Sequence, residues 1–369
     1  MIKIKKSGAE YSQISAIGEK IRKLEKSTGE EYLYLNQGVN AVVPIDLSKV
    51  IPLIDFNARE IQVYAPQKGR LQLKHAINRV YFQGTTSVDN ILIDNGGMSG
   101  LDLVFQAAVF NKVFLPSFYW GSYVNILKIR NKSFDFYDDF WQLEENMEAL
   151  KGNAVLICDP NNPLGNKYSD KELIKLIGLL NDNQITVIID SPYRGVFYSN
   201  DSFYAQIGNL ANVIIVESFS KSIGLSGQRI GFVHSNSNEL MNELGIRLMY
   251  ASNGVNAFAQ LLVEKLLTTK EGKEATKAFK DKTTKDILLN INYLRVKGFL
   301  AEEFYQDSHP KGIFVVVNLS ADSLLKYHIA AIDLDFFTQK YKDKAAGRSR
   351  ICVSVPHERL KNYFDKIGQ

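Results

Sequence analysis

Cysteine is nearly absent from this sequence. Its 369 residues include only Cys158 and Cys352, which excludes a disulfide framework and the paired cysteines of a zinc site. We therefore expect no metal centre, and a reducing compartment such as the cytoplasm.

Long apolar runs are also missing. No stretch approaches the roughly 18 uninterrupted apolar residues of a membrane-spanning helix. The basic opening MIKIKKSGAEYSQIS lacks the apolar core of a signal peptide. We expect a protein that neither crosses a membrane nor is secreted by that route.

Neither sign of charge is in large excess, since 44 Lys and Arg against 40 Asp and Glu give a net charge of +4. Basic residues gather at Lys3–Lys6 and Lys270–Lys285, but no aromatic residues interleave with them in the way that nucleic-acid-binding surfaces require. Both clusters are interpreted as solvated faces, and no nucleic-acid partner is expected.

What remains is the composition of an ordinary globular protein, 45% hydrophobic and 23% charged. Its length predicts one large domain and one smaller domain. We assign residues 1–45 to an N-terminal segment that joins the small domain, residues 46–270 to the large domain and residues 271–369 to the small C-terminal domain.

Short β-branched runs recur through the middle of the chain and alternate with helix-length segments such as Ser169–Asn183, where Ser169 is the expected N-cap. The runs predict strands at Ile91–Ile93, Lys112–Leu115, Ala154–Cys158, Thr186–Asp190, Val213–Val216 and Arg229–Val233. Apolar runs of this kind are typical of strands buried on both faces. Their alternation with helices predicts a mainly parallel α/β sheet flanked by helices, followed by a smaller α+β domain.

In such a sheet, ligands bind beyond the carboxyl ends of the strands. The predicted strands end in, or are followed by, the motifs DNGGMSG, PSFYWGSY, DPNNPLG, DSPYRG and ESFSKS. The most specific of these is Ser218-Phe-Ser-Lys221, with Arg229 eight residues later and Asp190-x-x-Tyr193 upstream.

Taken in order, from about Leu35 to Val355, these motifs resemble the class I and II aminotransferases. These are enzymes of fold type I, the aspartate aminotransferase fold, that depend on pyridoxal 5′-phosphate (PLP). The resemblance implies that Lys221 carries PLP as a Schiff base and then moves a proton as a general base. Such an amine must be unprotonated part of the time, which burial and nearby cations promote by lowering its pKa.

The resemblance also assigns the contacts of the cofactor ring. Asp190 would hold the proton on the pyridine nitrogen, which makes the ring an electron sink. Tyr193 and Asn162 would hydrogen-bond the phenolic oxygen. Trp120 would stack on the ring, with Phe118 as the alternative if the register differs.

The phosphate of the cofactor needs N–H groups at a helix start together with cationic and hydroxyl partners. The resemblance implies the backbone of Gly96, Gly97 and Met98, and the side chains of Ser218 and Arg229. Tyr64, in the setting Tyr-x-Pro-x-x-Gly, would reach the phosphate of a neighbouring subunit. We therefore expect a homodimer with shared active sites.

The α-carboxylate of the substrate calls for a guanidinium, which binds it through two hydrogen bonds. Arg350 matches the position of this residue in the family, and Arg348 is its rival. Gly38, through its backbone N–H, and Asn162 would complete the substrate site. Arg247 resembles an arginine that binds a distal carboxylate across the dimer interface in some relatives, although a helix arginine at the surface explains it equally well.

Singly, each motif residue has an ordinary explanation as a surface charge, a turn or a core aromatic. The joint order of the motifs is what argues for a site. One departure from the family's Asn-Pro-x-Asn-Pro-Thr-Gly pattern is that Asp159 and Leu164 replace its first Asn and its Thr.

The function expected from the sequence is ping-pong transfer of an amino group between an amino acid and a 2-oxo acid. A PLP-dependent lyase or decarboxylase of the same fold is the alternative, because this cofactor site hosts several reactions. A regulatory protein that carries a DNA-binding domain is disfavoured, since the chain leaves no room for one.

Overall fold

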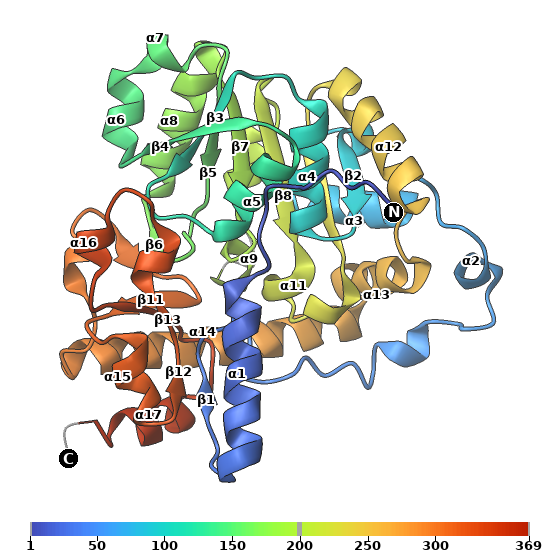
Figure 1. The fold of residues 1–369 in the computed structure, drawn as a ribbon. Coiled ribbons are helices and arrows are strands. Elements are labelled where there is room, and N and C mark those ends of the chain that lie inside the picture. The colour runs from blue at the N-terminus through green and yellow to red at the C-terminus, as the bar shows by residue number, and fades with distance from the viewer. Residues whose placement is uncertain (1, 198–200, 368–369) are drawn as a thin grey trace.

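A seven-stranded sheet forms the centre of the larger part of the molecule (Figure 1), in the order β2-β9-β8-β7-β5-β3-β4. The computed structural model describes residues 2–197 and 201–367. The strands of this sheet are β2 (Ile91–Asp94), β3 (Lys112–Pro116), β4 (Ser133–Tyr137), β5 (Ala154–Ile157), β7 (Thr186–Asp190), β8 (Val213–Ser218) and β9 (Gly231–Ser235). Strand β9 runs antiparallel to β2 and β8, and the other pairs are parallel. The predicted α/β class with a mainly parallel sheet is confirmed.

The central strands are built from the apolar runs that the sequence displays. All six residues of β8 and all four of β5 are buried, as expected for strands covered on both faces. One expectation was wrong in detail, and one strand was missed. Arg229 precedes β9 and has a φ of 51°, so it belongs to the turn before the strand. The edge strand β4 was not predicted, because the exposed Ser133 and Asp135 interrupt its aromatic residues and leave no continuous apolar run.

Helices cover the sheet, and α4 packs against both α5 and α12. Helix α8 begins one residue after Ser169, as predicted, although the Ser169 side chain makes no capping hydrogen bond. The helices of this part and its N-terminal approach are α1 (Gln13–Thr28), α2 (Arg59–Gln62), α3 (Leu71–Tyr81), α4 (Gly97–Ala107), α5 (Gly121–Ile129), α6 (Phe140–Glu145), α7 (Met147–Leu150), α8 (Asp170–Asp182), α9 (Arg194–Phe197), α10 (Phe203–Ile207), α11 (Phe219–Ser222), α12 (Asn238–Ser252) and α13 (Ala257–Thr268).

The smaller part contains an antiparallel sheet in the order β11-β14-β13. The long helix α14 (Lys270–Val296) leads from α13 into it (Figure 1). Its other elements are β11 (Phe314–Val317), β12 (Ile329–Ala330), β13 (Ile332–Asp333), β14 (Ser349–Cys352), α15 (Ala321–Leu325), α16 (Lys342–Ala345) and α17 (His357–Phe364).

Two short pairings tie the parts of the chain together. Strand β1 (Leu33–Tyr34) pairs in parallel with β12, so the N-terminal segment lies beside the smaller part. Strand β6 (Asn166–Lys167) pairs with β10 (His309–Pro310). The boundaries at residues 45 and 270 stay a prediction. Within residues 2–197 and 201–367, no helix has both the length and the apolar character needed to cross a membrane.

Candidate active site

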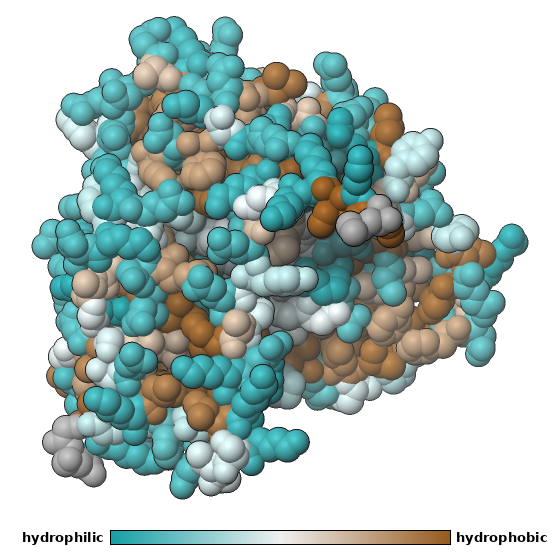
Figure 2. Space-filling model, viewed as in Figure 1, coloured by the Kyte–Doolittle hydropathy of each residue, from teal (hydrophilic) through white to brown (hydrophobic). Residues whose placement is uncertain are grey.

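A cleft of about 480 Å³ collects side chains from the ends of the central strands, from the start of α1 and from β14. Figure 2 shows this face of the molecule hollowed between α1 and the larger part. The predicted site residues in its wall are Gly38, Gly97, Met98, Trp120, Asn162, Asp190, Tyr193, Ser218, Lys221, Arg229 and Arg350. Residues distant in sequence therefore meet in one place, as the strand-end argument requires.

Asp190 ends β7 and is 4% exposed. The hydroxyl of Tyr123 donates to its Oδ2 at 2.5 Å. Burial raises the pKa of Asp190 to about 6, although the hydrogen bond from Tyr123 opposes this shift. A cationic N–H partner in the cleft would therefore be needed to stabilise its ionised form fully.

Lys221 lies on the single turn of α11, half-buried in the wall of the cleft. Burial lowers the pKa of its amine to about 8, and the charges of Arg229 and Arg350 act in the same direction. A substantial fraction of the amine is therefore unprotonated near neutral pH, which is the state that attacks an aldehyde or removes a proton.

Asn162 joins two of the predicted residues through its amide. Its Nδ2 donates to Tyr193 Oη at 3.1 Å, and its Oδ1 accepts from Arg350 Nη1 at 3.2 Å. Burial raises the pKa of Tyr193 well above its usual range. Tyr193 therefore keeps its proton and can donate a hydrogen bond into the cleft.

Arg350 is 1% exposed yet forms no ion pair with a carboxylate in the described part of the chain. Its guanidinium lies between the rings of Phe314 and Phe337, at 4.3 and 4.7 Å from their centroids. Nη2 donates to the carbonyl of Asn36, while Nε is buried without a partner. Burial lowers the pKa of Arg350 to about 10, so the cation lacks the anion that would stabilise it.

The rival Arg348 is placed differently. Its Nε donates to Glu303 at 2.6 Å, and its Nη1 donates to the carbonyl of Lys344 at 2.9 Å. It contributes nothing to the wall of the cleft.

At one end of the cleft, the start of α4 faces hydroxyl groups and a guanidinium. Arg229 Nη1 donates to the carbonyl of Ser226 at 2.9 Å, and Ser218 Oγ lies 3.0 Å from Ser220 Oγ. The backbone amide of Gly96, which was expected to bind the phosphate, donates instead to the buried Asp94 Oδ1 at 2.8 Å. It is therefore not free for a phosphate, and the amides of Gly97 and Met98 remain as candidate donors.

The structure also shows where three further candidates lie relative to the cleft. Trp120 lines the cleft, whereas Phe118 is buried against Phe304 and Tyr341. Tyr64 is 84% exposed between α2 and α3 and lies outside the cleft of its own chain. Arg247 pairs with Glu243 on α12 at 2.8 Å and also lies outside the cleft.

Sequence reasoning missed several residues of the wall. Tyr123 and Ser220 belong to the motifs already noted, so their proximity to Asp190 and Ser218 could have been inferred. Ser12, Ile14 and Ser15 at the start of α1, together with Gln37 and Phe314, also line the cleft. Nothing in their local sequence signals this, because the contact depends on how the N-terminal segment crosses the molecule.

Comparison with known proteins decides the family. Residues 31–367 match the family described as aminotransferase class I and II. The chain belongs to this family. It is accordingly an aminotransferase, and the members' dependence on PLP agrees with a cleft that contains a buried carboxylate and a lysine of lowered pKa.

Relatives of the family extend along most of the chain. A histidinol-phosphate aminotransferase of Brachyspira hyodysenteriae is 25% identical over 358 residues, which cover 89% of this chain and 98% of that protein. One from Flavobacterium johnsoniae is 33% identical over 159 residues, covering 41% of this chain and 44% of that protein. The structure of an aspartate aminotransferase from Thermus thermophilus with maleate superposes with a TM-score of 0.83 over 99% of both chains at 19% identity, which shows a shared fold.

Proposed function

We propose that the chain binds PLP on Lys221 and transfers an amino group between an amino acid and a 2-oxo acid by a ping-pong mechanism. One observation carries the proposal. The buried guanidinium of Arg350, which has no carboxylate partner in the described chain, is joined through Asn162 to Tyr193 in the same cleft that Lys221 and Asp190 line.

The residues of the cleft suit each part of this cofactor. Asp190 is a buried acceptor for a pyridine N–H, and Tyr193 and Asn162 are donors for a phenolic oxygen. The amides of Gly97 and Met98, with Ser218 and Arg229, suit a phosphate. When bound, PLP supplies an aldehyde to which amines add and a ring that withdraws electrons from the carbon bearing the amino group.

Each side chain then has a defined task. Arg350 binds the α-carboxylate through two N–H groups, and the N–H of Gly38 is the proposed second donor. This contact would orient the Cα–H bond toward Lys221, whose Nζ, once released by the incoming substrate amine, would accept the proton and pass it on. Asp190 keeps the ring nitrogen protonated throughout, while the indole of Trp120 covers the ring.

The assembly that we propose is a homodimer. Tyr64 is exposed, and Figure 2 shows apolar surface over the segment that carries α2, on the right of the view. Exposed apolar residues of this segment include Leu53, Phe56 and Val63. A second copy that covers this surface would bring Tyr64 to its neighbour's phosphate site. The two cysteines are free, in keeping with the cytoplasm as the proposed compartment.

The first test is chemical. Borohydride reduction of the PLP-loaded protein is expected to fix the cofactor on Lys221, mapped by peptide mass. Lys280 is the matched comparison, because burial lowers its pKa to about 8 as well, but it lies outside the cleft. A label on Lys280, or no label on Lys221, would contradict the assignment.

The second test separates transamination from other PLP reactions. Single-turnover mixing with amino acids and with histidinol phosphate, chosen because curated relatives act on it by name, is expected to remove the visible absorbance of the cofactor. The visible absorbance should stay absent until a 2-oxo acid is added. Release of ammonia or carbon dioxide with immediate return of the absorbance would indicate the lyase or decarboxylase alternative.

A further inference from the structure

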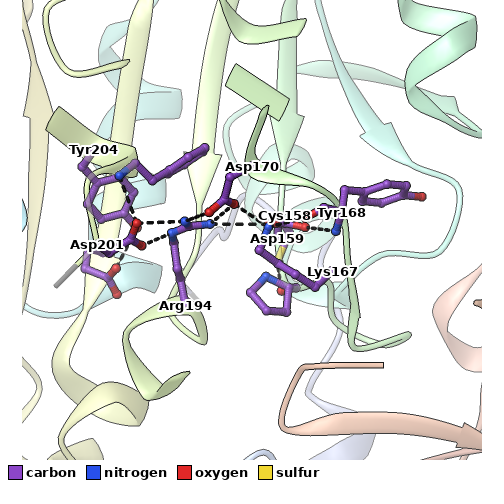
Figure 3. A network of polar contacts seen from close by, with 11 residues as sticks. Cys158, Asp159, Lys167, Tyr168, Asp170, Arg194, Asp201 and Tyr204 are labelled. Carbon is purple, nitrogen blue, oxygen red and sulfur yellow. Dashed lines mark hydrogen bonds and ion pairs between the residues drawn. The ribbon is translucent and has the colours of Figure 1, made fainter. Parts of the chain in front are cut away.

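A second buried guanidinium, Arg194, follows Tyr193 directly and is 1% exposed. Its Nη1 and Nη2 donate to the two oxygens of Asp170 at 2.9 and 2.6 Å. Nε donates to Asp201, and Nη2 does so at 3.0 Å. The guanidinium also lies 4.0 Å from the centroid of the Phe203 ring. Figure 3 shows Arg194 at the middle of this network.

Lys167 and Asp159 extend the network toward the cleft. Lys167 Nζ lies 2.7 Å from Asp159 Oδ2 and 2.6 Å from Asp170 Oδ1, and Arg194 Nη1 lies 3.8 Å from the same Asp159 oxygen. Asp159 Oδ1 accepts from the N–H of Tyr168 at 3.0 Å. Although burial opposes ionisation, Arg194 and Lys167 hold the pKa of Asp170 at about 2. Asp170 therefore remains charged over the working range of pH, whereas burial raises the pKa of Asp159 although Lys167 and Arg194 oppose that shift.

The network holds both ends of the segment that carries Asn162. Asp159 precedes Asn162 and Lys167 follows it, so their ion pair closes the segment into a loop. Gly165 within this loop has a φ of 68°, and a Cβ there would lie 1.8 Å from the carbonyl oxygen of Phe314. The backbone of the loop thus packs closely against β11 at Gly165, while Arg194 holds the chain next to Tyr193.

Two donors depend on this arrangement. Tyr193 Oη accepts from Asn162 and keeps its own hydrogen, and the second Nδ2 hydrogen of Asn162 has no hydrogen-bond acceptor among the described residues. Both side chains line the cleft. Their mutual bond can form only if the Asp159–Lys167 loop and the start of α9 keep their relative positions.

We propose that Arg194, Asp159 and Lys167 are positioning residues that hold Asn162 and Tyr193 together as the paired hydrogen-bond donors of the cofactor's phenolic oxygen. The proposal rests on the proposed function for the identity of that acceptor. It also gives a physical role to Asp159, which is partnered by two cations where the family pattern has an uncharged asparagine.

The variants are Asp159→Asn, which keeps the shape and removes the charge, Lys167→Met and Arg194→Leu. Arg130→Leu is the matched control, because Arg130 also makes a two-bond pair, with Asp102 at 2.6 Å for both bonds, but neither residue belongs to the 159–167 segment or to α9. If Arg194→Leu fails to fold, the other two variants decide.

The main measurement is the pH midpoint of the visible absorbance change of the PLP-loaded proteins. Donors to the phenolic oxygen weaken its hold on the proton of the adjoining Lys221 linkage, so disordering them is expected to raise the midpoint by about one pH unit. Arg130→Leu should leave the midpoint unchanged. Arg194→Lys, which keeps a cation, should raise the midpoint less than Arg194→Leu does. Lowered thermal stability with an unchanged midpoint in all three variants would overturn the proposal.

Hydrogen exchange of cofactor-free protein gives a readout that does not depend on PLP. Amides of residues 159–167 are expected to exchange about tenfold faster in Asp159→Asn and Lys167→Met than in Arg130→Leu. Unchanged exchange there would overturn the proposal even if the parent protein proved unable to bind PLP. Faster exchange without PLP binding would contradict the proposed function and leave the structural coupling established.

Discussion

Arg194 and Arg350 are the two largest fully buried side chains of the described molecule, and their surroundings are opposite. Each guanidinium lies over a phenylalanine ring, at 4.0 and 4.3 Å. Arg194 binds Asp170 and Asp201, whereas Arg350 has only neutral oxygens as partners. Burial lowers the pKa of Arg350 to about 10, while for Arg194 the two carboxylates more than offset burial and raise the pKa.

The two lysines repeat this contrast. Lys167 is 4% exposed and paired with Asp159 and Asp170, whereas Lys221 forms no ion pair in the described chain. Removing one partner of a buried ion pair destabilises the structure, because the other partner is left as an uncompensated charge in a medium of low dielectric constant. A cation without a carboxylate partner is available to a ligand, and we propose a carboxylate as the ligand of Arg350 and an aldehyde as that of Lys221.

The largest expected effect is on stability. Arg194→Leu leaves Asp159, Asp170 and Asp201 with less compensation, so the free energy of unfolding should fall by about 3–5 kcal/mol. Chemical denaturation measures this. Arg130→Leu, which breaks a partly exposed pair, should lose at most about 1 kcal/mol. Equal losses in the two variants would remove the distinction between the network and an ordinary surface ion pair.

The next effect is on catalysis. Arg350→Leu should lower kcat/KM for α-amino acids by about 10²- to 10³-fold, because truncating one member of a buried charge pair costs this much binding. Its free energy of unfolding should change by less than about 1 kcal/mol, since an unpaired buried cation is itself costly. Arg348→Leu is the control and should retain kcat/KM. A loss of stability in Arg350→Leu as large as in Arg194→Leu would contradict the contrast.

The third effect concerns pH. Uptake of PLP by the cofactor-free protein should accelerate about tenfold per pH unit below pH 8 and level off above it, because only the unprotonated Lys221 attacks the aldehyde. Stopped-flow absorbance measures the rate. Lys221→Arg should show no such phase. A rate that continued to rise as far as pH 10 would mean that the pKa of Lys221 is not lowered.

The smallest effect is stabilisation by a simple anion. Propionate should raise the Tm of the cofactor-free protein by a few degrees at saturation, because it supplies the missing carboxylate to Arg350. The Arg350→Leu variant should show no rise beyond that given by chloride at equal ionic strength. If both proteins respond equally, propionate acts elsewhere.

The central sheet and the cleft residues could be predicted from the sequence to a greater extent than the ion-pair network of Arg194. The central strands are continuous apolar runs, so their positions and the convergence of their end motifs followed from pattern alone. Asp190 ends β7 and Lys221 follows β8, whereas Arg350 lies within β14 of the smaller sheet and was assigned from the family resemblance alone. The partners of Arg194 could not be predicted, because Asp159 and Asp170 are distant in sequence and surface pairs would look the same. Arg229 was placed in a strand because nothing local indicates its positive φ.

Other misses have the same cause. The amide of Gly96 is engaged by Asp94 through a hydrogen bond within one turn, which depends on the backbone angles of that turn and not on its composition. Residues at the start of α1 line the cleft although they are distant in sequence from the other cleft residues. The sequence of α1 is that of an exposed, lysine-rich helix and gives no sign of this contact. The sequence pattern was therefore enough to find the candidate site residues. The residues that hold them in place could be found only from the tertiary structure.

The amide of Asn162 joins Tyr193, proposed to contact the cofactor, to Arg350, proposed to bind the substrate carboxylate. A ligand that tightens Arg350 acts on Asn162 Oδ1, and a ligand that tightens Tyr193 acts on Nδ2 of the same planar group. Because a coupling free energy has one value whichever site is filled first, any factor by which a carboxylate strengthens PLP binding is the factor by which PLP strengthens carboxylate binding. Asn162 is thus a physical route by which the two affinities can be coupled, and the size of that coupling is the same in whichever order the two ligands bind.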